Sequence, residues 1–88
     1  MRINNLNEGT VMGNQTEIEY LSKMIFDKYG KVALDTKECA EVTGQAVVTL
    51  KSHRALNVGI PYLKDIRAVK YNVIDIAKWM LENRVRVA

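Results

Sequence analysis

The stretch that decides the fold lies near the middle of the chain and reads LDTKECAEVTGQAVVTLKSHR, residues 34–54. Asp35 and Glu38 have the spacing of a capping box, in which each side chain accepts a hydrogen bond from the backbone N–H of the other residue. This spacing predicts that a helix begins after Asp35 and continues for about two turns. Gly44 is predicted to end it, because glycine readily adopts the left-handed conformation of a helix C-terminus.

A second helix is predicted directly after this glycine, over residues 46–56. Val47, Leu50 and His53 share one of its faces, which is expected to point inward. Two short helices joined by a tight turn that contains glycine are typical of a helix-turn-helix. The same pattern also occurs in three-helix bundles, so the segments that follow have to separate the two interpretations.

The next segment is predicted to form a small hairpin and then a last helix. Pro61 blocks continuation of the second helix, since proline lacks a backbone N–H. Residues 62–71 then have the pattern of a strand, a turn and a second strand. Asn72 is a good N-cap for a helix that runs to about Asn83.

The N-terminal part is predicted to contain one more helix. Thr16 and Glu19 repeat the capping-box spacing, so a helix is expected from Thr16 to Tyr29, before Gly30. Residues 31–34 are too few to be assigned as a strand. The predicted organisation is a mobile arm over residues 1–15, a single domain over residues 16–83 and a basic tail over residues 84–88.

Length and composition limit the classes of function. The chain has 88 residues, of which 48% are hydrophobic and 26% are charged, as in an ordinary small globular domain. A core of this size leaves no room for a deep substrate cavity, which favours functions carried on an outer face over catalysis. No stretch is apolar enough to span a membrane and no signal sequence is present, so a cytoplasmic location is expected.

No cofactor, metal or catalytic group is predicted. Cys39 is the only cysteine, and together with His53 it supplies too few ligands for a zinc site. Because the sequence fixes no carboxylate or nucleophile beside His53, a structural role or a phosphate contact is expected for it. Cys39 is expected to be a small buried residue, and Tyr71 and Trp79 to complete the core.

The positive charge of the chain is concentrated in one region. Residues 1–30 carry three basic and four acidic side chains, whereas residues 45–70 carry five basic side chains and a single acid, Asp65. The second region therefore has a net charge of +4, against +3 for the whole chain. Clustered positive charge is typical of proteins that bind nucleic acid, and a solvated charged face is the simpler alternative.

The order of these segments resembles the small excisionase-like and AlpA-like regulators of phages and integrating elements, which share a winged helix-turn-helix with MerR-type DNA-binding domains. The resemblance is carried by LDTKECAEVTGQAVVTLKSHR, by IPYLKDIRAVKY for the wing and by NVIDIAKWM for the closing helix. It implies a mainly α fold with a small β-hairpin (α+β). It also implies sequence-specific binding of double-stranded DNA at the nucleoid, as an excisionase-like architectural factor or a transcriptional regulator. The implied partners are DNA, an integrase or recombinase, and further copies of the chain on the DNA.

Two sets of side chains are the candidates for contact with DNA. The outer face of the second helix of the turn motif is predicted to meet base edges in the major groove, which is wide enough for an α-helix. Basic side chains of the wing are predicted to bind phosphates or to enter the minor groove, with Arg67 the most favoured of them. The recognition-helix candidates are Gln45, Val48, Thr49, Lys51, Ser52 and Arg54, and the wing candidates are Lys64, Arg67 and Lys70.

Two other functions remain open from the sequence. Phage terminase small subunits are similar in having a short winged motif that ends in a helix like Ala77-Lys78-Trp79. A packaging subunit also needs a ring-forming region, for which the chain offers only the helix over residues 16–29. A protein-interaction module, such as an antirepressor, would use that same helix together with the basic tail.

Overall fold

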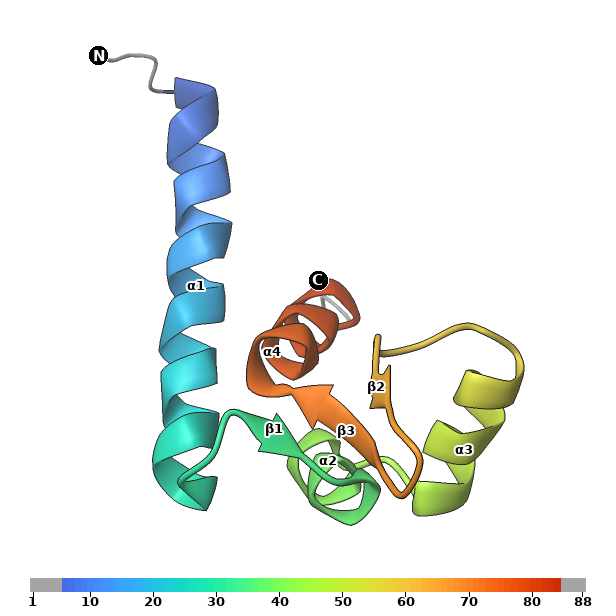
Figure 1. The fold of residues 1–88 in the computed structure, drawn as a ribbon. Helices are drawn as coiled ribbons and strands as arrows, with labels where there is room; N and C mark the ends of the chain where they lie inside the picture. The colour runs from blue at the N-terminus through green and yellow to red at the C-terminus, as the bar shows by residue number, and fades with distance from the viewer. Residues whose placement is uncertain (1–5, 85–88) are drawn as a thin grey trace.

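The computed structural model describes residues 6–84 and, from residue 15 onward, their side chains. Within this range the chain forms four helices and three short strands, and the strands make one antiparallel sheet (Figure 1). The predicted mainly helical fold with a small β-hairpin is confirmed at this level. The elements are α1 (Leu6–Tyr29), β1 (Ala33–Leu34), α2 (Thr36–Thr43), α3 (Val47–Ala55), β2 (Leu63–Lys64), β3 (Val69–Asn72) and α4 (Val73–Glu82).

Local hydrogen bonds define α2 and the turn to α3 as predicted. The N–H of Glu38 donates to Asp35 Oδ1 at 2.7 Å, and the N–H of Asp35 donates to Glu38 Oε1 at 3.0 Å, which completes the capping box of α2. Gly44 follows α2 with a left-handed φ of 76°, and its N–H donates to the carbonyl of Ala40 at 2.9 Å. The chain then enters α3, which packs against α2.

The strand β3 lies in the centre of the sheet, and both neighbours run antiparallel to it. On one side β1 pairs with β3, so that Leu34 lies opposite Tyr71. On the other side β2 pairs with β3, so that Leu63 lies opposite Lys70, and these two strands form the predicted hairpin. The sequence did not assign β1, because two residues show no readable alternation and only pairing with distant β3 makes them a strand.

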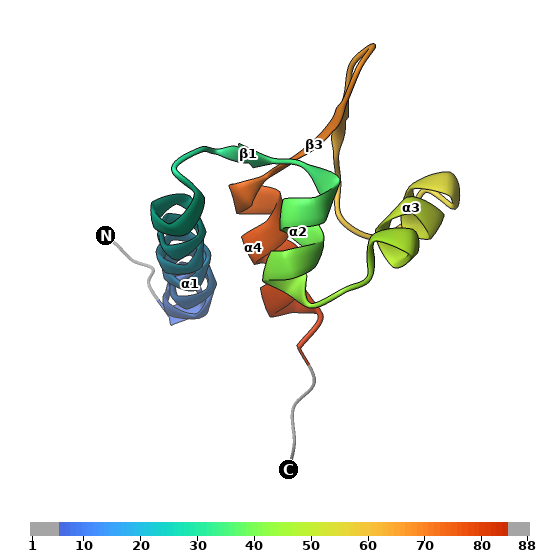
Figure 2. The same ribbon diagram turned by 90° about the horizontal axis from the view of Figure 1, so that it is seen from below.

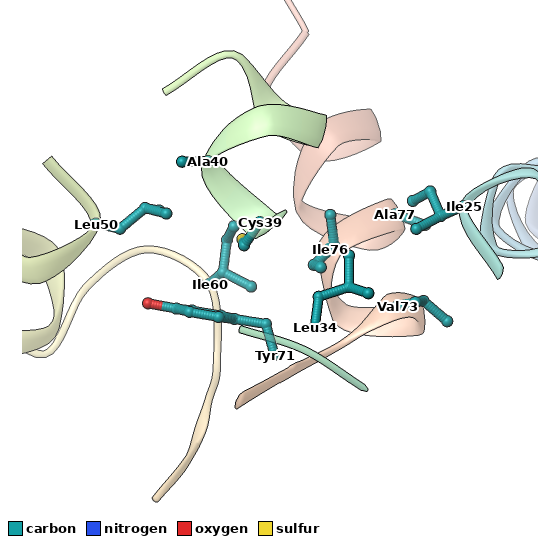
Figure 3. Close-up of a cluster of buried hydrophobic side chains, with 10 residues drawn as sticks. All are labelled: Ile25, Leu34, Cys39, Ala40, Leu50, Ile60, Tyr71, Val73, Ile76 and Ala77. Carbon is teal, nitrogen blue, oxygen red and sulfur yellow. The ribbon is translucent and has the colours of Figure 1, made fainter. Parts of the chain in front are cut away.

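The core lies where the sheet, α2 and α4 meet the inner sides of α1 and α3 (Figure 3). Leu50 enters it from α3 and Ile25 from α1, while Tyr71 is only 1% exposed, as predicted for a residue that completes the core. Because α3 and β3 pack on the same core, the orientation of α3 relative to the sheet is fixed. The buried apolar residues are Ile25, Leu34, Cys39, Ala40, Leu50, Ile60, Tyr71, Val73, Ile76 and Ala77.

The first helix begins earlier than the sequence predicted. It starts at Leu6, so the expected start at Thr16 is wrong, and residues 6–15 of the expected arm are helical. Residues 1–5 lie outside the described part of the chain. Extending an existing helix by one residue costs much less than nucleating a new one, so a helix anchored by its packed half continues even through weak helix formers. A capping-box pattern at Thr16 therefore lies inside the helix.

The helices α1 and α3 lie at opposite ends of the molecule. α1 packs mainly against α4, and the hydroxyl of Tyr29 near its C-terminal end donates to the Glu41 carboxylate on α2. Figures 1 and 2 show α3 and the β2–β3 hairpin together at the other end, with the hairpin projecting away from the helices. Arg84, after α4, lies 3.4 Å from Glu17 in an ion pair, and residues 85–88 of the predicted basic tail fall outside the described residues.

Candidate nucleic-acid interface

The outer face of α3 carries most of the predicted recognition residues. Val48 is 71% exposed, and Lys51 and Ser52 are also exposed, because Leu50 on the other side of the helix is buried in the core. Thr49 is half-buried beside them. The helix therefore has one face fixed in the core and one face with small, apolar and basic side chains open to a partner.

Gln45, just before α3, is placed differently from the prediction. It is half-buried, and its side-chain oxygen Oε1 is buried with no hydrogen-bond partner among the described residues. Its amide is therefore turned at least partly into the protein, so Gln45 is less suited to a base edge than Thr49. α3 itself begins at Val47 with no side-chain hydrogen bond from the N-cap residue Ala46.

The tip of the hairpin is a tight turn that is bonded internally. The N–H of Asp65 donates to the carbonyl of Ala68 at 3.0 Å. The Asp65 carboxylate accepts a hydrogen bond from the N–H of Arg67 at 2.8 Å. Asp65 is thus engaged with the backbone of the turn, while Arg67 and the neighbouring Ile66 extend into solvent.

The basic side chains of α3 and the hairpin carry charge that nearby acids do not neutralise. Lys51, Lys64 and Arg67 are exposed and Lys70 is half-buried. None of the four forms a salt bridge with another side chain within residues 15–84. The ion pairs of that range join Lys23 to Asp27, Lys31 to Glu38 and Arg84 to Glu17. With Asp65 as the single acid on these elements, the end of the molecule formed by α3 and the hairpin presents a net positive charge.

Arg54, one of the predicted recognition-helix residues, has its guanidinium engaged by other side chains of the protein. It is half-buried and donates to Tyr71 Oη at 2.5 Å and to Thr36 Oγ1 at 3.3 Å. It also lies over the rings of Tyr62 and Tyr71, 5.7 and 5.9 Å from their centroids. A phosphate contact would have to break these interactions. Arg54 therefore links α3 to the sheet through its guanidinium.

His53 also faces the protein. It is half-buried, and its Nδ1 atom is buried without a hydrogen-bond partner in the described part of the chain. Gly59 in the loop between α3 and β2 lies directly against it, since a Cβ atom built on Gly59 would lie 2.8 Å from His53 Nδ1. These contacts fit the structural role that the sequence suggested for His53.

Cys39 is fully buried, and burial raises the pKa of its thiol to about 12. The reactive thiolate is therefore not formed near neutral pH, and the residue is the small core residue that was predicted. Within the described residues, no three His, Cys, Asp or Glu side chains are grouped so that they could hold a metal ion. No helix in that range is both long and apolar enough to cross a membrane.

Comparisons with known protein families, curated proteins and solved structures found no significant match to the chain. The elements that carry the remaining candidates, α3 and the hairpin, both lie on the side of the molecule away from α1, and the hairpin tip projects away from the helices (Figure 2).

Two features of α3 and the hairpin could not be predicted from the sequence. The hydrogen bond from Arg54 to Tyr71 joins residues 17 positions apart, and only the fold brings them together. The exposure of Ile66 depends on where the hairpin turn falls, and by its type alone this residue is equally typical of a buried strand.

Proposed function

We propose that this chain is a sequence-specific double-stranded DNA-binding protein with a winged helix-turn-helix, in which α3 is the recognition helix and the β2–β3 hairpin is the wing. The observation that carries the proposal is the group of basic side chains on these two elements that have no ion-pair partner within residues 15–84. Clustered charge of this kind is the electrostatic basis of DNA binding. The resemblance to excisionase-like and AlpA-like regulators supports a role as an architectural factor in excision or as a transcriptional regulator.

In this proposal α3 lies in the major groove, where each base pair presents a different pattern of donors and acceptors. Thr49 hydrogen-bonds a base edge, Val48 packs on a thymine methyl group, and Lys51 binds guanine or a phosphate. Ser52 suits a phosphate oxygen. The start of α3 lacks a capping side chain, so its first N–H groups favour a DNA phosphate at that end.

The wing follows the adjacent minor groove. Arg67 is drawn to the negative potential of a narrow groove, and Lys64 and Lys70 neutralise phosphates, which positions the protein without reading sequence. Arg54 contributes indirectly, because its hydrogen bonds keep α3 in one orientation relative to the sheet. Bending DNA costs a few kcal/mol, so several copies on neighbouring sites are expected, with an integrase or recombinase if the chain acts in excision.

Footprinting on DNA that flanks the encoding gene, at two salt concentrations, tests the proposal. Direct repeats near an attachment site would indicate excision, and one site centred on a promoter would indicate repression. Arg67→Ala should weaken binding to all sequences and lower the slope of log K against log salt by about 1. Thr49→Ala should change the preference at one base pair by about 1–3 kcal/mol.

Lys23→Ala is the matched control. Lys23 is exposed on α1, the helix at the other end of the molecule, and it is paired with Asp27 at 3.1 Å. The control should leave affinity and salt slope nearly unchanged. If Arg67→Ala and Thr49→Ala bind DNA as Lys23→Ala does, α3 and the hairpin do not contact the duplex and the assignment is wrong.

A protein-interaction module is the alternative that a separate observation favours. Tyr20 and Met24 lie one turn apart on α1 and are 68% and 52% exposed, which suits contact with another protein. This alternative would be favoured if the wild-type chain bound no duplex but bound a partner protein, and if Tyr20→Ala abolished that protein binding. Terminase-like recognition would use the same face of α3 and differ in stoichiometry, which sedimentation on DNA distinguishes.

A further inference from the structure

Ile66 is the most exposed large apolar side chain in the part of the chain whose side chains the structure describes. It is 99% exposed at the tip of the hairpin, whereas the next most exposed residues of this class are Val48 at 71% and Leu56 and Tyr20 at 68%. A β-branched apolar residue is a poor choice for a turn, where glycine, asparagine, aspartate and serine dominate. Full exposure also leaves unused the roughly 1.5–3 kcal/mol that burial of such a side chain provides. The side chain therefore contributes little to folding and is available to a ligand.

The hairpin holds this side chain on a firm support. Lys64 pairs with Val69 across the two strands, directly beside the turn. The turn itself is closed by the bond from Asp65 N–H to Ala68 and by the bond from Arg67 N–H to the Asp65 carboxylate. Figure 2 shows the hairpin projecting well beyond the helices. The backbone that carries Ile66 is thus restrained by these bonds and projects ahead of the helices.

The charges around Ile66 indicate what kind of ligand it meets. Lys64 and Arg67 are exposed within two residues of it, and the one acidic side chain of the turn, Asp65, is engaged with the backbone. An apolar protein surface that covered Ile66 would also have to desolvate these cations. A DNA minor groove offers phosphates to the cations and stacked base edges to the apolar side chain.

We propose that Ile66 inserts as an apolar wedge into the minor groove, between two base pairs, and kinks the duplex toward the major groove. This inference rests on the proposed DNA-binding function and adds how the wing deforms its site. Proteins that bind in the minor groove and bend DNA use such wedges, of which isoleucine is one. Partial unstacking costs a few kcal/mol and least at flexible steps such as TA and CA, so the wing prefers such a step beside the sequence read by α3.

The experiment uses the full chain and the footprinted duplex, with 2-aminopurine placed at the step under the wing and donor and acceptor dyes at the ends. Wild type should raise the 2-aminopurine fluorescence and increase end-to-end energy transfer, because the step unstacks and the duplex bends. Ile66→Ala should lose both signals and bind about 10- to 50-fold more weakly, with the salt slope unchanged because no charge is removed. Ile66→Leu should keep both signals, since leucine is also an apolar wedge.

Ile74→Ala is the matched control, because Ile74 is 60% exposed at the start of α4, at the other end of β3 from the hairpin tip. It should leave affinity, bend and fluorescence at wild-type values. If the wild-type chain binds the site without bending it or changing the fluorescence, the wedge is wrong and the DNA-binding proposal stands. The same conclusion follows if Ile66→Ala bends the DNA as much as wild type does. Wild type that binds no duplex overturns both proposals. Circular dichroism of Ile66→Ala should match wild type, since the side chain is almost fully solvated.

Discussion

The hydroxyl of Tyr71 is predicted to contribute about 1.5–2 kcal/mol to the free energy of unfolding, and Tyr71→Phe removes it. The Arg54 guanidinium donates to this hydroxyl at 2.5 Å, and Tyr71 is only 1% exposed. Hydrogen bonds to charged groups contribute about 1.5–3 kcal/mol. We expect the lower part of this range, because the half-buried guanidinium keeps Thr36 at 3.3 Å and both aromatic rings in the variant.

Urea denaturation followed by far-ultraviolet circular dichroism measures this contribution. For a chain of this size the free energy of unfolding falls by about 1–1.5 kcal/mol per molar urea, so the midpoint of Tyr71→Phe should drop by about 1–2 M. Tyr62→Phe is the matched control, because its ring lies under the same guanidinium at 5.7 Å, against 5.9 Å for Tyr71. Within the described residues the Tyr62 hydroxyl makes no side-chain hydrogen bond, so its removal should shift the midpoint by less than about 0.5 M. Equal shifts in the two variants would refute the reasoning.

The same pair of residues separates two roles of Arg54 on DNA. Tyr71→Phe keeps every positive charge, so the salt slope should stay at the wild-type value. The affinity for DNA should fall, because the hydrogen bond that holds α3 against the sheet is lost. Arg54→Ala should likewise leave the slope unchanged. A slope lowered by about 1 in Arg54→Ala would mean that this guanidinium contacts a phosphate after all.

Further predictions concern the core, the α2 cap and the thiol. Leu50→Ala should lower the free energy of unfolding in urea by about 2–5 kcal/mol, because the side chain is 1% exposed and its removal leaves a cavity; a loss below about 1 kcal/mol would contradict this packing. Glu38 has a pKa below its usual 4.5, first through the N–H of Asp35 and then through the Lys31 ammonium. The stabilisation from the ionised Glu38 carboxylate is therefore present above pH 4.5 and is lost as the pH falls below it, so Glu38→Gln should flatten the decline in Tm on the acid side of that value. Cys39 should be alkylated by iodoacetamide at least about 1,000-fold more slowly in the native chain than in urea at pH 8, because the thiol is buried and its pKa is raised to about 12; similar rates would show that the core is open.

Local patterns in the sequence predicted those elements whose ends are set by nearby residues. The Asp35 and Glu38 capping box and the left-handed Gly44 both appear as expected, since each depends on atoms no more than four residues away. The same box pattern at Thr16 failed. A helix begins at a capping box only if the residues before the box are not helical. The four residues of the box carry no information about that, because it depends on the residues before them.

Features that depend on contacts between distant segments could not be predicted. The strand β1 exists only because Leu34 lies opposite Tyr71, far along the chain. Arg54 had the composition and position of a DNA contact, and no local pattern indicated that Thr36, Tyr62 and Tyr71 would contact its guanidinium. The exposed candidates on α3 were easier to predict, because burial of Leu50 fixes which face of the helix is outward.

Position 59 admits no side chain larger than the hydrogen of glycine. Any other L-residue there would take on a φ of 85°, and its Cβ atom would lie 2.8 Å from Nδ1 of His53. Relief of that clash requires His53 to move, and His53 belongs to α3. In a library of all single substitutions selected only for a folded chain, position 59 should therefore retain glycine, while position 66 should accept most polar residues.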